Sequence, residues 1–188
     1  IYGSPEHETV DALVELYRKS TSLKERQEKA TVLPGEESLS SAQDLARQFF
    51  IDLENGVDYA VRFWRWCLDI SMKYFIDTYS RLGITFDHYL GESFYSKMLP
   101  DVEKKLRDAN LLLESKGAFG VDLGETLGFA RVTTPDGRSL YLTRDLAAAE
   151  YRHQEFGFDK CIYVVGTPQT LHFQQLFEIL NRLKSPCA

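Results

Sequence analysis

Three polar side chains near the end of the chain have the types needed to bind a flat cation. Tyr141 and Asp145 stand four residues apart, and Gln169 follows the next apolar run. A guanidinium group carries a positive charge and five N–H donors. A carboxylate can balance the charge, and a carboxylate, a hydroxyl and an amide oxygen can all accept hydrogen bonds from the donors. We therefore predict a pocket for a planar, positively charged ligand.

Each of these residues also has an ordinary structural explanation. Tyr141 could fill a core from a strand, and Asp145 could be an acid in a first helical turn, where the helix dipole favours it. Gln169 could be a polar residue in solvent at the start of a helix. His172 follows one turn later, where a capping or surface role competes with a role in catalysis. Composition and spacing leave these alternatives open.

The elements expected around these residues alternate between strand and helix. Strands are predicted over 138–142 and 160–165, and helices over 144–156 and 169–184. Thr143 is expected to cap the first of these helices. The run 160–165 is almost entirely apolar, as expected for a strand covered on both faces. This order predicts half of a doubly wound sheet, in which ligands bind beyond the carboxyl ends of the strands.

The rest of the chain is predicted to be mainly helical. Four helices are expected, over 5–22, from Ser40 or Ser41 to 55, over 57–82 and over 95–115. The third carries an apolar stripe at helical spacing, formed by Val57, Val61, Trp64, Leu68, Phe75, Tyr79 and Leu82. Further strands are expected over 84–90, 118–123 and 129–133, and the turn 134–137 would join the last of these to 138–142.

Composition narrows the class of protein. With 44% hydrophobic residues in 188, the chain can bury a core, and its net charge of −6 argues against a broad nucleic-acid face. Its three cysteines are widely spaced, which disfavours a zinc site or a disulfide framework and favours an intracellular, reducing compartment. No membrane-length apolar run and no phosphate-loop motif is present. Because the chain starts at Ile1, we expect a piece of a longer protein.

Several ordered blocks of the sequence resemble the arginyl-tRNA synthetases, a family of class I aminoacyl-tRNA synthetases, in their mitochondrial and fungal-like branch. The blocks are 74–82, 89–95, 140–149, 158–165 and 169–173. The resemblance extends over about residues 45–184 and is weak before them. It rests on several matching blocks in the right order and not on one short pattern.

The resemblance implies a site and a reaction. It implies that Tyr141, Asp145 and Gln169 contact the substrate L-arginine. His172, which closely follows Gln169, is our candidate for the rim of the active site. The resemblance also implies a ligase that uses ATP, with Mg²⁺, to form arginyl-adenylate and then transfers the arginyl group to tRNA(Arg). No tightly bound cofactor, no resident metal and no membrane association are expected. The parent protein is expected to be a monomer in the cytoplasm or the mitochondrial matrix.

Two signature motifs of class I enzymes are absent from the sequence. Neither a His-x-Gly-His-type nor a Lys-Met-Ser-Lys-type motif occurs, and the family's order would place one before Ile1 and the other after Ala188. We therefore expect no catalytic residue here and little turnover by the isolated chain. The alternative is a non-catalytic, synthetase-derived binding or scaffold module. A helical interaction protein built on the Trp64/Trp66 helix would leave the strand-helix-strand tail unexplained.

The fold expected is α/β, with a partial Rossmann-like nucleotide-binding parallel sheet and helical and small β insertions. Its catalytic core is assigned to residues 57–93 and 139–188. Residues 1–56 are assigned to a helical insertion or linker, and residues 94–138 to an α+β insertion.

Overall fold

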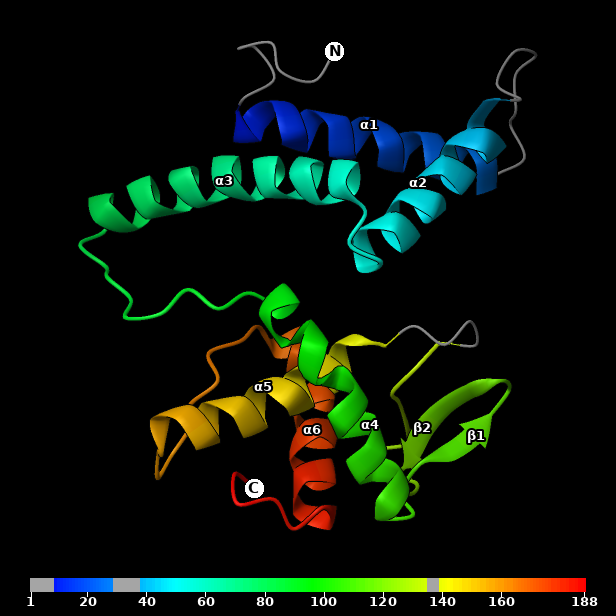
Figure 1. Ribbon diagram of the computed structural model, residues 1–188, viewed down its shortest axis with the longest axis vertical. Coiled ribbons are helices and arrows are strands. Elements are labelled where there is room, and N and C mark those ends of the chain that lie inside the picture. The colour runs from blue at the N-terminus through cyan, green and yellow to red at the C-terminus, as the bar shows by residue number, and fades with distance from the viewer. Residues whose placement is uncertain (1–8, 29–37, 135–138) are drawn as a thin grey trace. The chain divides into compact units, whose positions relative to one another are not determined.

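The computed structural model describes residues 9–28, 38–134 and 139–188, which divide after Asp87 into two compact units. The first unit is helical where it is described, with α1 (Val10–Glu28), α2 (Ser38–Glu54) and α3 (Asp58–Arg81) (Figure 1). The second holds η2 (Glu92–Met98), α4 (Leu99–Asp108), β1 (Leu113–Ser115), β2 (Ala118–Asp122), β3 (Phe129–Arg131), α5 (Tyr141–Phe156), η3 (Thr167–Gln169) and α6 (Thr170–Arg182).

The first unit is held together by aromatic contacts between α2 and α3. The Phe49 ring meets the rings of Tyr59 and Phe63 edge-on, with centroids 6.0 and 5.4 Å apart. The three helices expected from the apolar spacing are confirmed, and α1 lies alongside α3. Among the described residues of this unit, however, Ala60 alone is buried. The apolar stripe of α3 is therefore largely uncovered within its own unit.

The strand expected over 84–90 is wrong. Gly83 takes a left-handed backbone conformation, with φ +66°, and ends the run of α3. The residues after it form no helix and belong to no ladder. Alternating side chains favour a strand only where another strand can pair with it.

The single helix expected over 95–115 is also wrong, because α4 ends at Asp108. Asn110 adopts φ +54°, and its N–H donates to the carbonyl of Arg107 at 2.9 Å. The N–H of Leu111 donates to the carbonyl of Leu106, also at 2.9 Å. These two bonds form a Schellman motif, which satisfies the last carbonyls of α4 and turns the chain towards the sheet.

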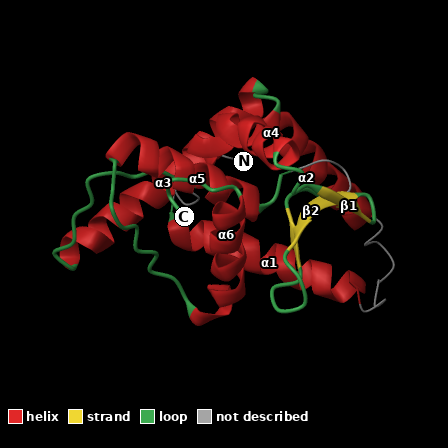
Figure 2. Cartoon of the chain, turned by 90° about the horizontal axis from the view of Figure 1, so that it is seen from below, coloured by secondary structure: helices red, strands yellow, loops and turns green. Residues whose placement is uncertain are grey.

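The sheet of the second unit is antiparallel, with strand order β1-β2-β3 (Figure 2). Lys116 and Gly117 both have positive φ and form the two-residue turn between β1 and β2, as in a type I′ hairpin. Gly120 of β2 lies opposite Arg131, and a Cβ there would come within 2.5 Å of the Phe129 ring. The strands expected over 118–123 and 129–133 are confirmed in shortened form.

Part of the expected hairpin after β3 is present. Thr133 and Ser139 form an isolated antiparallel bridge, and the N–H of Leu140 donates to the carbonyl of Val132 at 2.9 Å. Most of the predicted turn, residues 135–138, lies outside the described residues.

The strand expected over 138–142 is wrong, because α5 already begins at Tyr141, with Leu140 as its N-cap residue. Thr143 does not cap this helix. Its side chain is fully buried, and its hydroxyl donates to the carbonyl of Val132 at 2.7 Å. Thr143 therefore connects the first turn of α5 to the residue that directly follows β3.

The strand expected over 160–165 is wrong for the described structure. These residues form no helix and no ladder, and Ile162 and Val164 are 74% and 94% exposed. A doubly covered strand needs neighbouring strands and helices on both faces, and none of the described elements supplies them. The described fold is mixed α and β, with a small antiparallel sheet in place of the expected parallel one.

The core of the second unit lies between α4, α5, α6 and the sheet. Its fully buried side chains include Leu106 from α4, Leu146 from α5 and Leu176 and Ile179 from α6. This packing fixes α5 and α6 against each other, so side chains at their amino-terminal ends keep a defined separation. Within the described part of the chain, no helix combines the length and apolar character needed to cross a bilayer.

Candidate functional site

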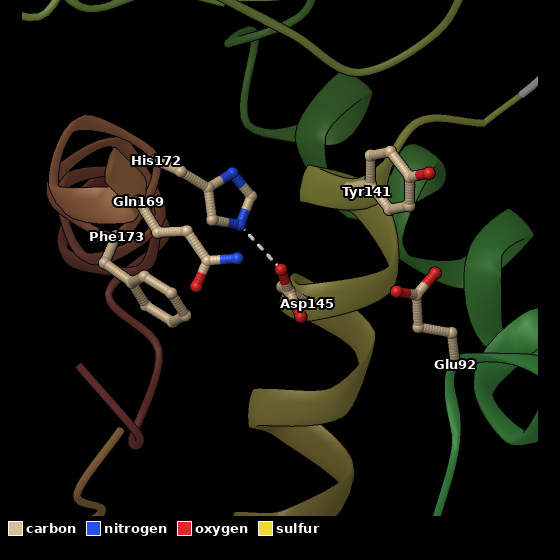
Figure 3. A pocket seen from close by; sticks show the side chains of 6 residues that line it. All are labelled: Glu92, Tyr141, Asp145, Gln169, His172 and Phe173. Atoms are coloured by element: carbon tan, nitrogen blue, oxygen red, sulfur yellow. Dashed lines mark hydrogen bonds and ion pairs between the residues drawn. The ribbon is translucent and has the colours of Figure 1, made fainter. Parts of the chain in front are cut away.

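The amino-terminal ends of α5 and α6 border an open hollow of about 400 Å³ in the second unit. Its lining consists of Glu92, Tyr141, Asp145, Gln169, His172 and Phe173 (Figure 3). The volume falls within the range of about 300–1,000 Å³ that is usual for small-molecule sites. The structure therefore brings together all three predicted ligand-binding residues and the predicted rim residue.

The first turns of α5 supply Tyr141 and Asp145. Residues four apart lie on one face of a helix, one turn above the other, and both side chains border the hollow. Tyr141 is 66% exposed, which rules out the alternative that it fills a core. Asp145 lies about one turn further into the helix than expected, outside the first turn. A favourable interaction with the helix dipole in the first turn therefore does not account for an acid at this position.

The junction of η3 and α6 supplies the opposite wall. Gln169 is the last residue of η3 and the N-cap residue of α6. It is exposed, as its structural alternative required, but it also lines the hollow. The Phe173 ring lies 4.9 Å from the Tyr163 ring and 5.2 Å from the imidazole of His172, between centroids. An aromatic cluster thus supports this wall.

Asp145 and His172 meet across the hollow. The Nε2 atom of His172 lies 2.6 Å from Oδ2 of Asp145, and the dashed line in Figure 3 marks this contact. The side chains are 28% exposed for His172 and 32% exposed for Asp145. The ring of His172 is hydrogen-bonded to the Asp145 carboxylate, at the centre of the site. A capping or surface role is therefore not the main role of this side chain.

Two lining residues were not predicted as part of the site. Glu92 begins η2 and lies on the Tyr141 side of Asp145 in Figure 3. Phe173 was expected only as part of the core face of its helix. An acid directly after Gly91, at the end of an extended apolar segment, was the available signal for Glu92. Its distance in sequence from Asp145 concealed its place in the site, since only folding makes both residues line one hollow.

Tyr163 stays protonated well above neutral pH. Burial raises the pKa of Tyr163 to about 12, and the neighbouring Cys161 raises it too, while the Arg152 guanidinium opposes them. That guanidinium lies 5.9 Å from the centre of the Tyr163 ring. A neutral tyrosine in this position packs on Phe173 and so stabilises the α6 side of the hollow.

The acidic and imidazole side chains of the hollow do not form a metal site. Among the described residues, no group of three or more His, Cys, Asp or Glu side chains is arranged to hold a metal ion. The two carboxylates and the imidazole of the hollow are therefore not a metal-binding cluster. We assign no step to a resident metal.

Comparison with known proteins identifies the family. Residues 4–186 match the family described as class I tRNA synthetases (R), catalytic domain. The chain belongs to this family. It is 46% identical over 143 residues to an arginine--tRNA ligase of Lactococcus lactis, and 50% identical over 140 residues to one of Clostridioides difficile. These alignments cover 76% and 74% of the chain.

The fold agrees with this assignment. A crystal structure of arginyl-tRNA synthetase from Plasmodium falciparum superposes with a TM-score of 0.68 at 26% identity, over 80% of the chain and 27% of that protein. The chain spans about a quarter of the length of the curated relatives that it matches, 25% in both bacterial cases. The resemblance to arginyl-tRNA synthetases expected from the sequence blocks is confirmed.

Proposed function

We propose that this chain forms the arginine-binding part of an arginine--tRNA ligase. The observation that supports the proposal most strongly is the hollow in which Glu92 and Asp145, from two different elements, border one space. A guanidinium brings one positive charge and a planar set of donors, and carboxylates are its best acceptors. The arginine--tRNA ligases that resemble the chain point to the same ligand.

In this proposal each lining residue has a separate role. Asp145 accepts N–H bonds from the guanidinium, and Glu92 adds a second negative charge beside it. The Gln169 amide and the Tyr141 hydroxyl orient the rest of the substrate. Lysine offers a compact ammonium in place of a planar fork, and citrulline has no charge, so both should bind less well.

The proposed reaction is that of the parent enzyme. The carboxylate of arginine attacks the α-phosphate of ATP, which arrives with its Mg²⁺, and releases pyrophosphate. A hydroxyl of the terminal adenosine of tRNA(Arg) then displaces AMP from arginyl-adenylate. This chain binds arginine and holds it for the attack, a contribution of proximity and orientation. We place the parent inside the cell, in the cytoplasm or the mitochondrial matrix, as a monomer.

The proposal extends to the fold of the parent. Residues 57–93 and 139–188 would belong to a Rossmann-like core, with 1–56 and 94–138 as insertions. The apolar segment 160–165 would be one strand of a parallel sheet, and its exposed Ile162 and Val164 would be covered there. Gln169 would then follow the carboxyl end of a sheet strand, where ligands bind in such folds.

Asp145→Asn in the full-length enzyme that carries this segment tests the proposed role. Loss of one charged hydrogen-bond partner should cost about 1.5–3 kcal/mol, and so raise the KM for arginine about 10- to 100-fold. We expect less than the ~3–5 kcal/mol of a fully desolvated pair, because the Asp145 side chain is 32% exposed. The measurement is arginine-dependent ATP–pyrophosphate exchange.

Asp108→Asn is the matched control. Asp108 forms an exposed ion pair with Lys104 on α4, and such pairs contribute little. Its KM for arginine should remain that of the unmodified enzyme. An unchanged KM for arginine in Asp145→Asn, with a normal response in the control, would remove the basis of the proposal.

A further inference from the structure

The contact between Asp145 and His172 joins two elements that the core holds rigidly. Asp145 belongs to α5, whose Leu146 is fully buried, and His172 belongs to α6, whose Leu176 is fully buried. The imidazole also packs edge-on against Phe173, with centroids 5.2 Å apart. Since the ring stands on a fixed helix, the hydrogen bond restricts the carboxylate side chain.

The chemistry of the two groups decides which one donates. An ionised carboxylate can only accept, so the proton of the 2.6 Å contact lies on Nε2 of His172. A carboxylate offers about four lone-pair positions, two on each oxygen. His172 uses one position on Oδ2. A side-on guanidinium needs one position on each oxygen, so imidazole and substrate can be bound at the same time.

We infer that His172 is a positioning residue, which fixes the plane of the Asp145 carboxylate for side-on binding of a guanidinium group. This inference rests on the proposed function. It adds an explanation of how the Asp145 carboxylate is held in the orientation that binds the ligand. A free aspartate side chain would have to be ordered by the substrate at the expense of affinity. The hydrogen bond from the imidazole orders the carboxylate beforehand, so less of the binding free energy is spent on ordering it.

Two substitutions of His172 in the full-length enzyme test this role. His172→Ala removes the donor and should raise the KM for arginine about 10-fold, as expected for one charged hydrogen bond. The KM for ATP should not change. His172→Gln offers an amide N–H of similar reach and should recover most of the loss. A structural role alone would not be rescued by an amide, and thermal unfolding curves show whether both variants fold.

His88→Ala is the matched control, because His88 is exposed and contacts the Phe156 ring outside the hollow. It should leave the KM for arginine unchanged. An unchanged or lowered KM in His172→Ala would overturn the inference, and a lowered value would mean that the imidazole competes with the substrate. Failure of rescue by His172→Gln, in a folded protein, would overturn it as well.

Asp145→Asn, measured in parallel, separates this inference from the proposed function. If Asp145→Asn raises the KM for arginine and His172→Ala does not, the positioning role fails and the arginine site stands. If neither variant changes the KM, the arginine site itself is wrong.

Discussion

Thr143 shows how one hydroxyl can determine where a functional helix begins. It lies two residues after Tyr141 and two before Asp145, and its side chain is fully buried. Its hydroxyl donates to the carbonyl of Val132, 11 residues earlier in the chain. The bond is the second that this carbonyl accepts, beside the one from the Leu140 N–H, and it fixes the rotation of the first turn of α5. The direction in which the two predicted ligand-binding residues point depends on that rotation.

Thr143→Val should therefore destabilise the protein. The substitution keeps the shape of the side chain but removes one of the two hydrogen bonds that the Val132 carbonyl accepts, because the bond from the Leu140 N–H remains. The loss should cost about 0.5–1.5 kcal/mol. Urea denaturation at fixed pH measures the loss as a lower transition midpoint.

Thr170→Val is the control for this prediction. The Thr170 hydroxyl donates to the carbonyl of Thr167, again at 2.7 Å, but in an exposed position where water can replace it. Its cost should be about 0.5 kcal/mol or less. Equal losses in the two variants would mean that burial does not determine the value of the Thr143 bond.

The segment 160–165 shows a conflict between local sequence and local structure. Its apolar character favours a covered strand, yet Val164 is 94% exposed and the described residues offer no ladder to pair with it. Exposed apolar side chains cost free energy in water, and an unpaired edge beside them is prone to pair with another chain. Our proposal of a parallel sheet in the parent protein removes this cost.

Amide hydrogen exchange tests the proposed strand. In the chain alone, the amides of 161–165 should exchange rapidly, because this segment forms no ladder hydrogen bonds that would protect them. In a full-length enzyme that carries the segment, they should exchange at least tenfold more slowly, an order-of-magnitude expectation for ladder hydrogen bonds. The amides of Ala147 to Ala149, buried in α5, serve as a reference that is slow in both. Equal exchange at 161–165 in both proteins would contradict the proposal.

At the scale of the whole molecule, the two units differ in how well they are packed. Of the described hydrophobic residues, only Ala60 is buried in the first unit, whereas the second has a continuous core. The chain between the end of α3 and η2 exposes large side chains, among them Leu82 and Phe86. Local stability should follow this difference, because buried apolar contacts supply most of it.

Limited digestion with chymotrypsin should therefore cut first in this connection, after Leu82, Phe86 or Tyr89. A product close to residues 88–188 should then accumulate, because the buried core of the second unit holds its helices and sheet together. Mass spectrometry of the time course identifies the products. The prediction fails if early cuts fall within α5 or α6, because the second unit would then lack the stability that its core implies.

The sequence alone determined the positions of most helices, because each depends on an apolar spacing that can be read locally. It also determined Tyr141, Asp145 and Gln169 as candidates, since the chemistry of a side chain does not depend on folding. The ends of elements were less accessible. The end of α4 depends on Asn110 in a left-handed conformation, and the start of α5 depends on a bond from Thr143 to a distant carbonyl.

Only the tertiary structure decided which side chains share a space. Glu92 and Asp145 are far apart in sequence, and the bond between Asp145 and His172 spans 27 positions. No local pattern encodes such pairs, because they follow from the packing of α5 against α6 and η2. Whether an apolar run such as 160–165 forms a strand is likewise decided by its neighbours, because a strand is completed by hydrogen bonds to another segment.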